Sequence, residues 1–215
     1  MARVRSWSAS FACALFAGTA WLAPALALSI FLAACRHIVP VDTVPLDQAG
    51  MSYDAIQQLR ALDITSPEVA DLARARAGGL SESSCIEAVR IFHGRHQAFH
   101  AGEAMAGLAG AGMSEVSILE LARLDQLGAD SGEFQAMRLA GLSEAIVLEV
   151  ARHRATGQPV LAGASLALLR NTGLRDATLL ELARRGVPDS QASTILAGRR
   201  HGATDAEILR AFPGT

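Results

Sequence analysis

A pattern of apolar and polar positions recurs six times between residue 50 and the end of the sequence. Each copy opens with a glycine, continues with an apolar or small residue and then a polar one, and runs into a segment with apolar residues three or four positions apart. The glycines stand 29, 33, 29, 32 and 29 residues apart. A nearly fixed period of this length indicates a tandem array of supersecondary units. The copies begin at Gly50, Gly79, Gly112, Gly141, Gly173 and Gly202.

Local chemistry assigns a role to each position of the motif. Glycine takes the left-handed conformation that ends a helix, and the Leu or Met after it can fold back onto that helix. The next residue is Ser in four copies and Thr in the last, a natural N-cap for a second helix. The acid that follows complements the positive end of the helix dipole. Six residues past each glycine stands an apolar residue that we expect to face the core: Ile56, Cys85, Ile118, Val147, Leu179 and Ile208.

A first helix is also visible before most of the glycines. Apolar or small residues stand seven and four positions upstream, which places them on one helical face. Pro40 and Pro45 occupy this region in the first copy, so we expect the array to begin with a half unit. No segment alternates with period two over a useful length. The sequence therefore predicts an all-α fold of tandem helical hairpins of about 30 residues each, with roughly eleven short helices and no sheet.

The first 34 residues show a different pattern, a charged start followed by an apolar run. Arg3 and Arg5 precede an uncharged segment from 11 to 34, interrupted only by Pro24. This arrangement is typical of an export signal, although its length also suits a membrane-spanning anchor. The residues after it, up to position 49, contain two prolines and no sustained period, as in a tether. We therefore divide the chain into a signal at 1–34, a tether at 35–49 and a repeat domain at 50–215.

The end of the apolar run, Leu32-Ala33-Ala34-Cys35, resembles the lipobox of bacterial lipoproteins. The resemblance implies lipidation of the Cys35 thiol, cleavage after Ala34 and possible acylation of the new amino group. Two or three acyl chains would give a stable membrane anchor, whereas one chain binds only marginally. Arg36 in the next position resembles the pattern that sends lipoproteins to an outer membrane, and the periplasmic face of an inner membrane is the other location. An uncleaved N-terminal anchor, ordinary signal cleavage and a misassigned start remain alternatives.

The net charge bears on nucleic-acid binding, and the number of cysteines bears on disulfide formation. The formal net charge of -2, or -4 without Arg3 and Arg5, gives no support for a nucleic-acid-binding face. A helix-turn-helix protein with a misread leader is still a hypothesis, because ARAGGLSESSCIEAVR has the length and turn of that motif. Cys85 would be the only thiol of the mature chain apart from Cys35, so no internal disulfide is expected. We interpret Cys85 as a small buried hydrophobe.

A group of histidines is the most specific candidate for a metal-binding site. His93, His96, His100 and Glu103 follow a three-four-three spacing that would place them near one stripe of a continuous helix. Imidazoles at i and i+4, completed by a carboxylate, can bind zinc or another divalent metal. Gly94 and Gly102 weaken such a helix, and the stripe overlaps an apolar face. Partly buried histidines without a metal are the alternative.

The remaining polar residues predict structure rather than catalysis. Glu and Arg stand three apart on four of the second helices, a spacing that stabilises a solvated helix face or, as an alternative, forms a charge ladder for a partner. The recurring serines are explained by capping, and no nucleophile elbow or phosphate loop is present in the sequence. We therefore expect a lipid-anchored, non-enzymatic envelope protein without a cofactor. Its repeat domain would hold a protein partner.

Overall fold

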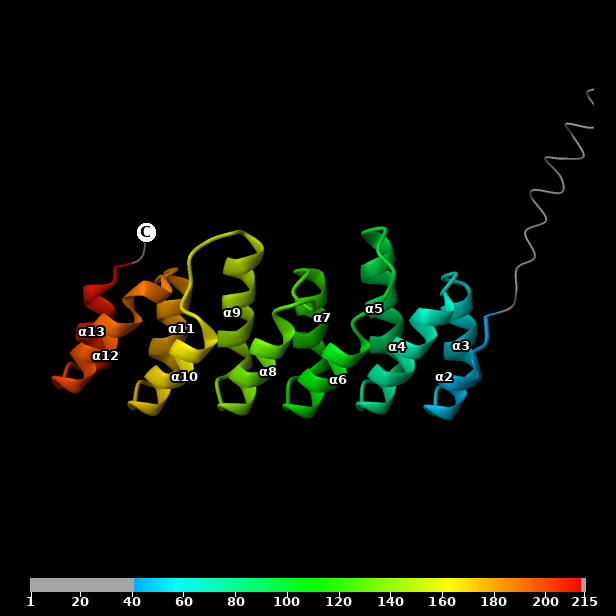
Figure 1. Ribbon diagram of the computed structural model, residues 1–215, viewed down its shortest axis with the longest axis horizontal. Helices are drawn as coiled ribbons and strands as arrows, with labels where there is room; N and C mark the ends of the chain where they lie inside the picture. Colours follow the sequence, from blue (N-terminus) through cyan, green and yellow to red (C-terminus); the bar gives the residue numbers. More distant parts are fainter. Residues whose placement is uncertain (1–40, 214–215) are drawn as a thin grey trace, which may run out of the picture. The chain divides into compact units, whose positions relative to one another are not determined.

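The computed structural model describes residues 41–213, and these residues are entirely helical (Figure 1). Twelve α-helices and one 3-10 helix lie in this range, and no strand does, which confirms the predicted fold class. Cys35 and the predicted signal lie outside the described residues. The helices are α2 (Val44–Gln48), α3 (Tyr53–Arg60), α4 (Ser66–Ala77), α5 (Glu82–Gly94), α6 (Gly102–Gly110), α7 (Glu115–Arg123), α8 (Ser131–Leu139), α9 (Glu144–Ala155), α10 (Gly163–Asn171), α11 (Asp176–Arg184), η1 (Asp189–Gln191), α12 (Ala192–Arg200) and α13 (Asp205–Ala211).

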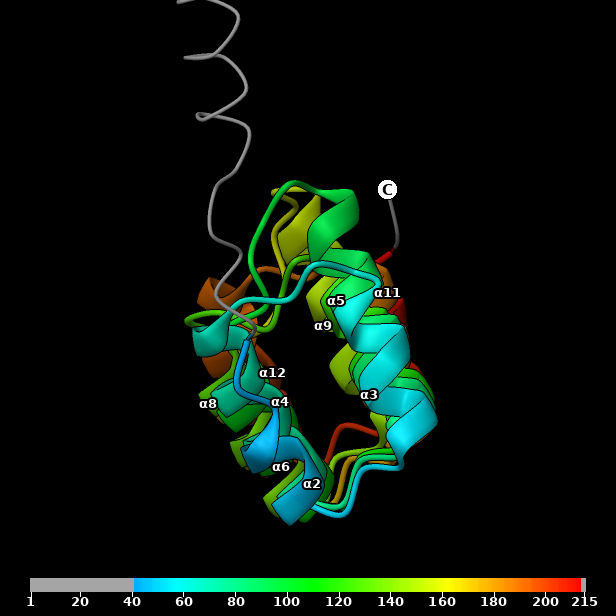
Figure 2. The ribbon, with the colours of Figure 1, turned by 90° about the vertical axis from the view of Figure 1, so that its right-hand side faces the viewer.

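The helices stack in two layers. The first helices of successive units pack in the order α2, α4, α6, α8, α10 and α12. The second helices pack in the order α3, α5, α7, α9, α11 and α13. Figure 2 looks along the stack and shows the two columns side by side. The repeats therefore form an open two-layer array in which each unit contacts its neighbours, as in other repeat architectures.

Each unit turns between its two helices at the glycine of the motif. All six motif glycines have a positive φ, from 75° at Gly50 and Gly112 to 97° at Gly79. The Leu or Met after the glycine donates its N–H to the first helix, as Met113 does to the Leu108 carbonyl at 3.0 Å. These contacts form the left-handed helix end that the sequence predicts. An L-residue with a Cβ atom at these positions would be strained.

The first unit is complete, and the prediction of a half unit was wrong. Residues 44–48, assigned to the tether from the sequence, form α2, whose Leu46 is fully buried. Pro45 lies in the first turn of this helix. Proline is well tolerated there because the first N–H groups of a helix have no intrahelical acceptor. Pro45 is therefore compatible with α2, although we expected prolines in this region to prevent a helix.

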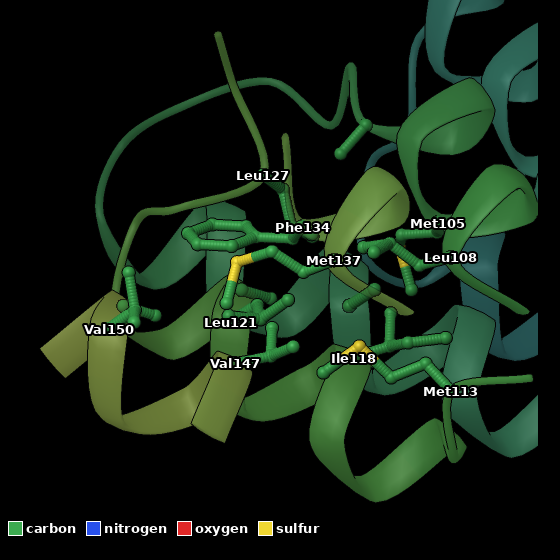
Figure 3. Close-up of a cluster of buried hydrophobic side chains, with 14 of the residues drawn as sticks. Met105, Leu108, Met113, Ile118, Leu121, Leu127, Phe134, Met137, Val147 and Val150 are labelled. Atoms are coloured by element: carbon green, nitrogen blue, oxygen red, sulfur yellow. The ribbon is translucent and has the colours of Figure 1, made fainter. Parts of the chain in front are cut away.

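The core lies between the two layers and runs through all six units. Figure 3 shows its middle part. The apolar residue six positions past each glycine is buried in every copy, from Cys85 at 0% exposed to Ile56 at 7%. Phe134 and Met137 of α8 point toward Leu121, Val147 and Val150 of the second layer. Each unit therefore completes the core of the next, and no unit buries its apolar face alone.

Helices α4 and α6 approach each other closely where α6 begins. Gly102 is buried, and a Cβ atom built on it would lie 1.9 Å from the carbonyl oxygen of Asp71 in α4. No side chain fits in that space. Gly102 therefore sets the distance between α4 and α6.

Candidate functional site

The histidine cluster does not form the single helical stripe on which the metal hypothesis depended. Helix α5 ends at Gly94, and His96 follows with a φ of 58°. His100 lies in the α5–α6 loop and packs edge-on against Phe92, with ring centroids 5.2 Å apart. Glu103 is exposed in the first turn of α6. The metal site stays a prediction, now without the helix geometry that motivated it.

His93 instead binds a buried carboxylate that sequence reasoning missed. Its Nε2 lies 2.7 Å from Oε1 of Glu68, a residue of α4 that is only 1% exposed. The same Oε1 accepts the backbone N–H of Phe99 at 2.8 Å. Oε2 accepts the N–H and the hydroxyl of Thr65, at 2.7 and 2.8 Å. The sequence Thr-Ser-Pro-Glu could have revealed the capping box at Thr65, but nothing local indicates the contacts with His93 and Phe99.

Hydrogen bonding determines the charge state of Glu68. Burial alone raises its pKa, but the bonds from Phe99, His93 and Thr65 outweigh burial, and the net shift is downward from 4.5. Both carboxylate oxygens already have two partners each, so neither is free for a ligand. A pocket of about 410 Å³ lies beside this carboxylate and is also lined by Asp63, His93 and His96. Within residues 41–213, no group of three or more His, Cys, Asp or Glu side chains is arranged to hold a metal ion.

The acids of the motif have a second role that the sequence did not predict. Glu82 of α5 accepts the N–H and the hydroxyl of Ser52, the N-cap of the preceding unit, at 2.7 and 2.6 Å. Glu115 binds Ser81 in the same way, and Glu144 binds Ser114. In an ordinary capping box, the third residue of the same helix supplies this carboxylate. Here the next unit supplies it, and we call each such contact an acid staple.

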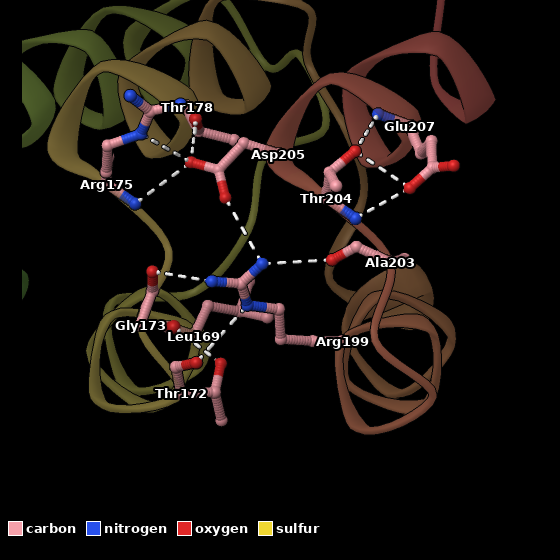
Figure 4. Close-up of polar contacts among 10 residues, drawn as sticks. All are labelled: Leu169, Thr172, Gly173, Arg175, Thr178, Arg199, Ala203, Thr204, Asp205 and Glu207. Carbon is pink, nitrogen blue, oxygen red and sulfur yellow. Dashed lines mark hydrogen bonds and ion pairs between the residues drawn. The ribbon is translucent and has the colours of Figure 1, made fainter.

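The last junction shows an acid staple together with an arginine contact (Figure 4). Asp205 of α13 accepts the N–H and Nε of Arg175, at 3.3 and 3.2 Å, and the hydroxyl of Thr178 at 2.7 Å. Arg199 donates to the carbonyl oxygens of Thr172, Gly173 and Ala203, at 3.3, 2.9 and 2.9 Å. Arg199 thereby links the C-terminal end of α10 to the turn between α12 and α13.

Arginines three residues before the glycine repeat this link elsewhere. Arg138 donates to the carbonyl oxygen of Gly112 in the preceding unit at 2.8 Å, and Arg170 donates to that of Ala140 at 2.9 Å. Free carbonyl groups at a helix C-terminus favour a cation. The recurrence of Arg at this position was visible in the sequence and could have revealed the link.

The two ends of the array and one internal junction depart from the staple pattern. Thr204, the last N-cap among the described residues, is closed by Glu207 of its own helix through an ordinary capping box. The first unit has Tyr53 where later units have the stapling acid. Asp176 pairs with Arg170 at 3.3 Å, and no hydrogen bond joins it to Ser143. Four of the five junctions in the described part of the chain therefore carry an acid staple.

The staples give a prediction that a double-mutant cycle can test. Ser81→Ala and Glu115→Gln each remove one side of a charged hydrogen-bond pair, so we expect a coupling free energy of about 1 kcal/mol between them. Ser143→Ala and Asp176→Asn form the matched control, because their junction lacks the staple. The measurement is urea unfolding of the four single and two double variants. Equal coupling free energies at both junctions would contradict the presence of an acid staple between Ser81 and Glu115.

The staples also predict an acid-labile array. Burial raises the pKa of Glu115, but hydrogen bonds from Ser81 and Ser84 outweigh it, and the pKa falls below 4.5. A group whose pKa is lowered by folding stabilises the protein fully above its unfolded pKa and loses that contribution as the pH falls through its folded pKa. We expect the free energy of unfolding to drop below about pH 4.5, and to drop less steeply in Glu115→Gln. Parallel pH profiles for the two proteins would refute this.

A charge ladder crosses the outer face of the second layer. Arg123 pairs with Glu87 of the preceding unit at 3.2 Å, and Arg152 pairs with Glu120 at 3.8 Å. The predicted pairs three residues apart form on α5, α7 and α9, at 3.8, 3.9 and 3.3 Å. On α11, Glu181 pairs with Arg185 at 2.8 Å instead of with Arg184. These charges are partly exposed and pair with each other, so each contributes little to stability.

Cys85 behaves as the sequence predicts. It is fully buried on α5 and forms no disulfide. Burial is the main reason that the pKa of its thiol rises to about 11. The thiolate, which is the reactive form, is therefore negligible at neutral pH.

Apolar side chains are exposed along the array. The large ones are Val44, Tyr53, Val116, Leu139 and Leu168, from 49% exposed at Leu168 to 76% at Val116. Leu139 ends α8, and Leu168 belongs to the neighbouring α10. An apolar pocket of about 310 Å³ lies between these two helices, lined by Ala136, Met137, Gly163 and Ala167 among others. Glu133 also lines this pocket, and the two leucines belong to the same two helices without lining it. We call Leu139, Leu168 and this pocket together the α8–α10 surface.

No protein-family model, curated protein or solved structure matches this chain. Among the helices that the structure describes, none is both long enough and apolar enough to cross a membrane.

Proposed function

We propose that this chain is a lipid-anchored protein of the bacterial cell envelope whose helical array binds another protein. The anchor is Cys35, which the resemblance to the lipobox identifies as the lipidated residue. The observation that supports binding is an extended two-layer surface with exposed apolar side chains. Arrays of this architecture commonly use such surfaces to hold protein partners, and exposed apolar patches commonly mark interaction sites.

The α8–α10 surface is the part of the array best suited to a partner. Leu139 and Leu168 are 70% and 49% exposed on adjacent first-layer helices. The pocket between these helices is lined mainly by small residues, so it can admit an apolar side chain of a partner. Interface energy concentrates where such a side chain fills a pocket.

The anchor is tested by the intact mass of the protein purified from its own membrane. We expect the mass of Cys35 to Thr215 plus acyl chains, and no acyl mass in a Cys35→Ser variant. A mass that retains residues 1–34 in both proteins would refute the lipoprotein assignment.

The partner surface is tested by charge substitution. Leu139→Asp and Leu168→Asp place a carboxylate on the apolar surface, so we expect a stoichiometric partner that co-purifies with the wild-type protein to be lost. Asn171→Asp, which adds the same charge to an exposed position of α10, is the matched control and should retain the partner. The melting temperature of each variant checks folding. Retention of the partner by both leucine variants would rule out this surface.

A further inference from the structure

The N-terminal end of the array exposes two large apolar side chains. Helices α2 and α3 have a neighbouring unit on one side only, and Figure 2 looks onto their open side. Val44 and Tyr53 are 55% and 74% exposed there. A shallow groove of about 210 Å³ runs between them and is also lined by Ile56, by Arg60 and by the polar side chains of Thr43, Asp47 and Gln57. We call Val44, Tyr53, Ile56 and Arg60 the end face.

The opposite end of the array is polar. Thr204 and Glu207 form the terminal capping box, and Arg200 and Arg210 are exposed beside it. Terminal repeats usually have a polar outer face, which keeps the array soluble. The C-terminal unit follows this rule and the N-terminal unit does not. We therefore expect another surface to cover the end face.

The chain length before Val41 places the end face near the proposed anchor. Only residues 36–40 separate Cys35 from the described chain. Fully extended, the six steps from Cys35 to Val41 span at most about 20 Å. Arg60 donates to the Thr43 hydroxyl at 2.8 Å, which holds the entering chain against α3. A chain lipidated at Cys35 thus keeps the end face within a short distance of the lipid.

We infer that the end face rests on the lipid surface that holds Cys35, so that the array stands on its N-terminal unit. This inference depends on the lipid anchor of the proposed function. Tyrosine favours the membrane–water interface because its ring is apolar and its hydroxyl is polar. Asp47 lines the groove, and Asp42 and Asp54 stand close by in the sequence, so negative charges outnumber that of Arg60. The contact is therefore with the interfacial region of zwitterionic lipid, without attraction to anionic headgroups.

Single tryptophans report this orientation. Both natural tryptophans, Trp7 and Trp21, precede the cleavage site, so the lipidated chain has none. Tyr53→Trp labels the end face. Val116→Trp is the matched control, because Val116 is 76% exposed, close to the 74% of Tyr53, and also lies in the first turn of a second helix. Each lipidated protein is reconstituted in phosphatidylcholine vesicles with brominated acyl chains, and its intact mass is recorded first.

We expect the Tyr53→Trp emission to shift to the blue and to be quenched by the brominated lipid, and the Val116→Trp emission to be unaffected. Quenching of both tryptophans would mean that the array lies flat, and would overturn the inference. A blue shift at position 53 without quenching would mean that protein, such as a second copy, covers the end face, and would also overturn it. Absence of quenching in a protein whose mass includes acyl chains would overturn the inference and leave the anchor intact. A mass without acyl chains would refute the anchor itself.

Discussion

Glu68→Gln is expected to lower the free energy of unfolding by about 3 kcal/mol, because it leaves buried donors without an anionic acceptor. The carboxylate is 1% exposed and accepts from Thr65, His93 and Phe99. An amide in its place points an N–H₂ group at two of these donors. Urea unfolding measures the effect, and Glu103→Gln, an exposed glutamate on α6, should change stability by less than about 0.5 kcal/mol.

The effect of Glu68→Gln should also be local. Its contacts join the start of α4 to the α5–α6 loop, so we expect the backbone amide of Phe99 to lose protection from hydrogen exchange. Amides of α10, which belongs to a distant unit, should keep theirs below the unfolding transition. Unchanged protection at Phe99 would show that this carboxylate does not hold the loop.

Gly102→Ala is expected to destabilise the protein by a similar amount, about 3 kcal/mol, because the new methyl group must displace backbone. The carbonyl oxygen of Asp71 lies 1.9 Å from the position of that Cβ, and a carbonyl in α4 cannot move aside as a flexible side chain can. The α4–α6 pair would have to separate.

Gly110→Ala on the same helix provides the control for Gly102→Ala. No atom lies within 4 Å of a Cβ at Gly110. The alanine should therefore stabilise the helix by about 0.4–1 kcal/mol through reduced freedom of the unfolded chain. Thermal unfolding of both variants distinguishes the two effects. A stabilised Gly102→Ala protein would mean that α4 and α6 are farther apart than the structure shows.

The features that were predicted correctly from the sequence are those that depend on interactions within a single unit. Left-handed glycines, serine caps and buried residues such as Ile118 and Val147 follow from interactions within about ten residues, so the repeat pattern identifies them. The fold class and the number of units follow from the same pattern. The leading helix at 44–48 was missed because a proline was interpreted as a helix breaker, although it stands in the first turn.

Contacts between units could not be predicted in the same way. The bond from Glu115 to Ser81 spans 34 residues and depends on the register of one unit against the next, which packing determines. Periodicity shows that an acid recurs, but not that it binds backwards along the chain. His93 is a similar case, because its spacing to His96 and His100 suggested a shared ligand, while its partner Glu68 lies 25 residues upstream.

The acid staples also determine the order in which the N-caps of successive units are completed during synthesis. During synthesis, a unit such as that of Ser81 emerges before the carboxylate that completes its N-cap, and must wait for about one further unit to be translated. The unit of Thr204 has no such wait, because Glu207 belongs to its own helix. The N-cap of α13 therefore needs no residue from a later unit. A polypeptide truncated before Asp205 would leave the N–H of Arg175 and the hydroxyl of Thr178, at the start of α11, without their acceptor.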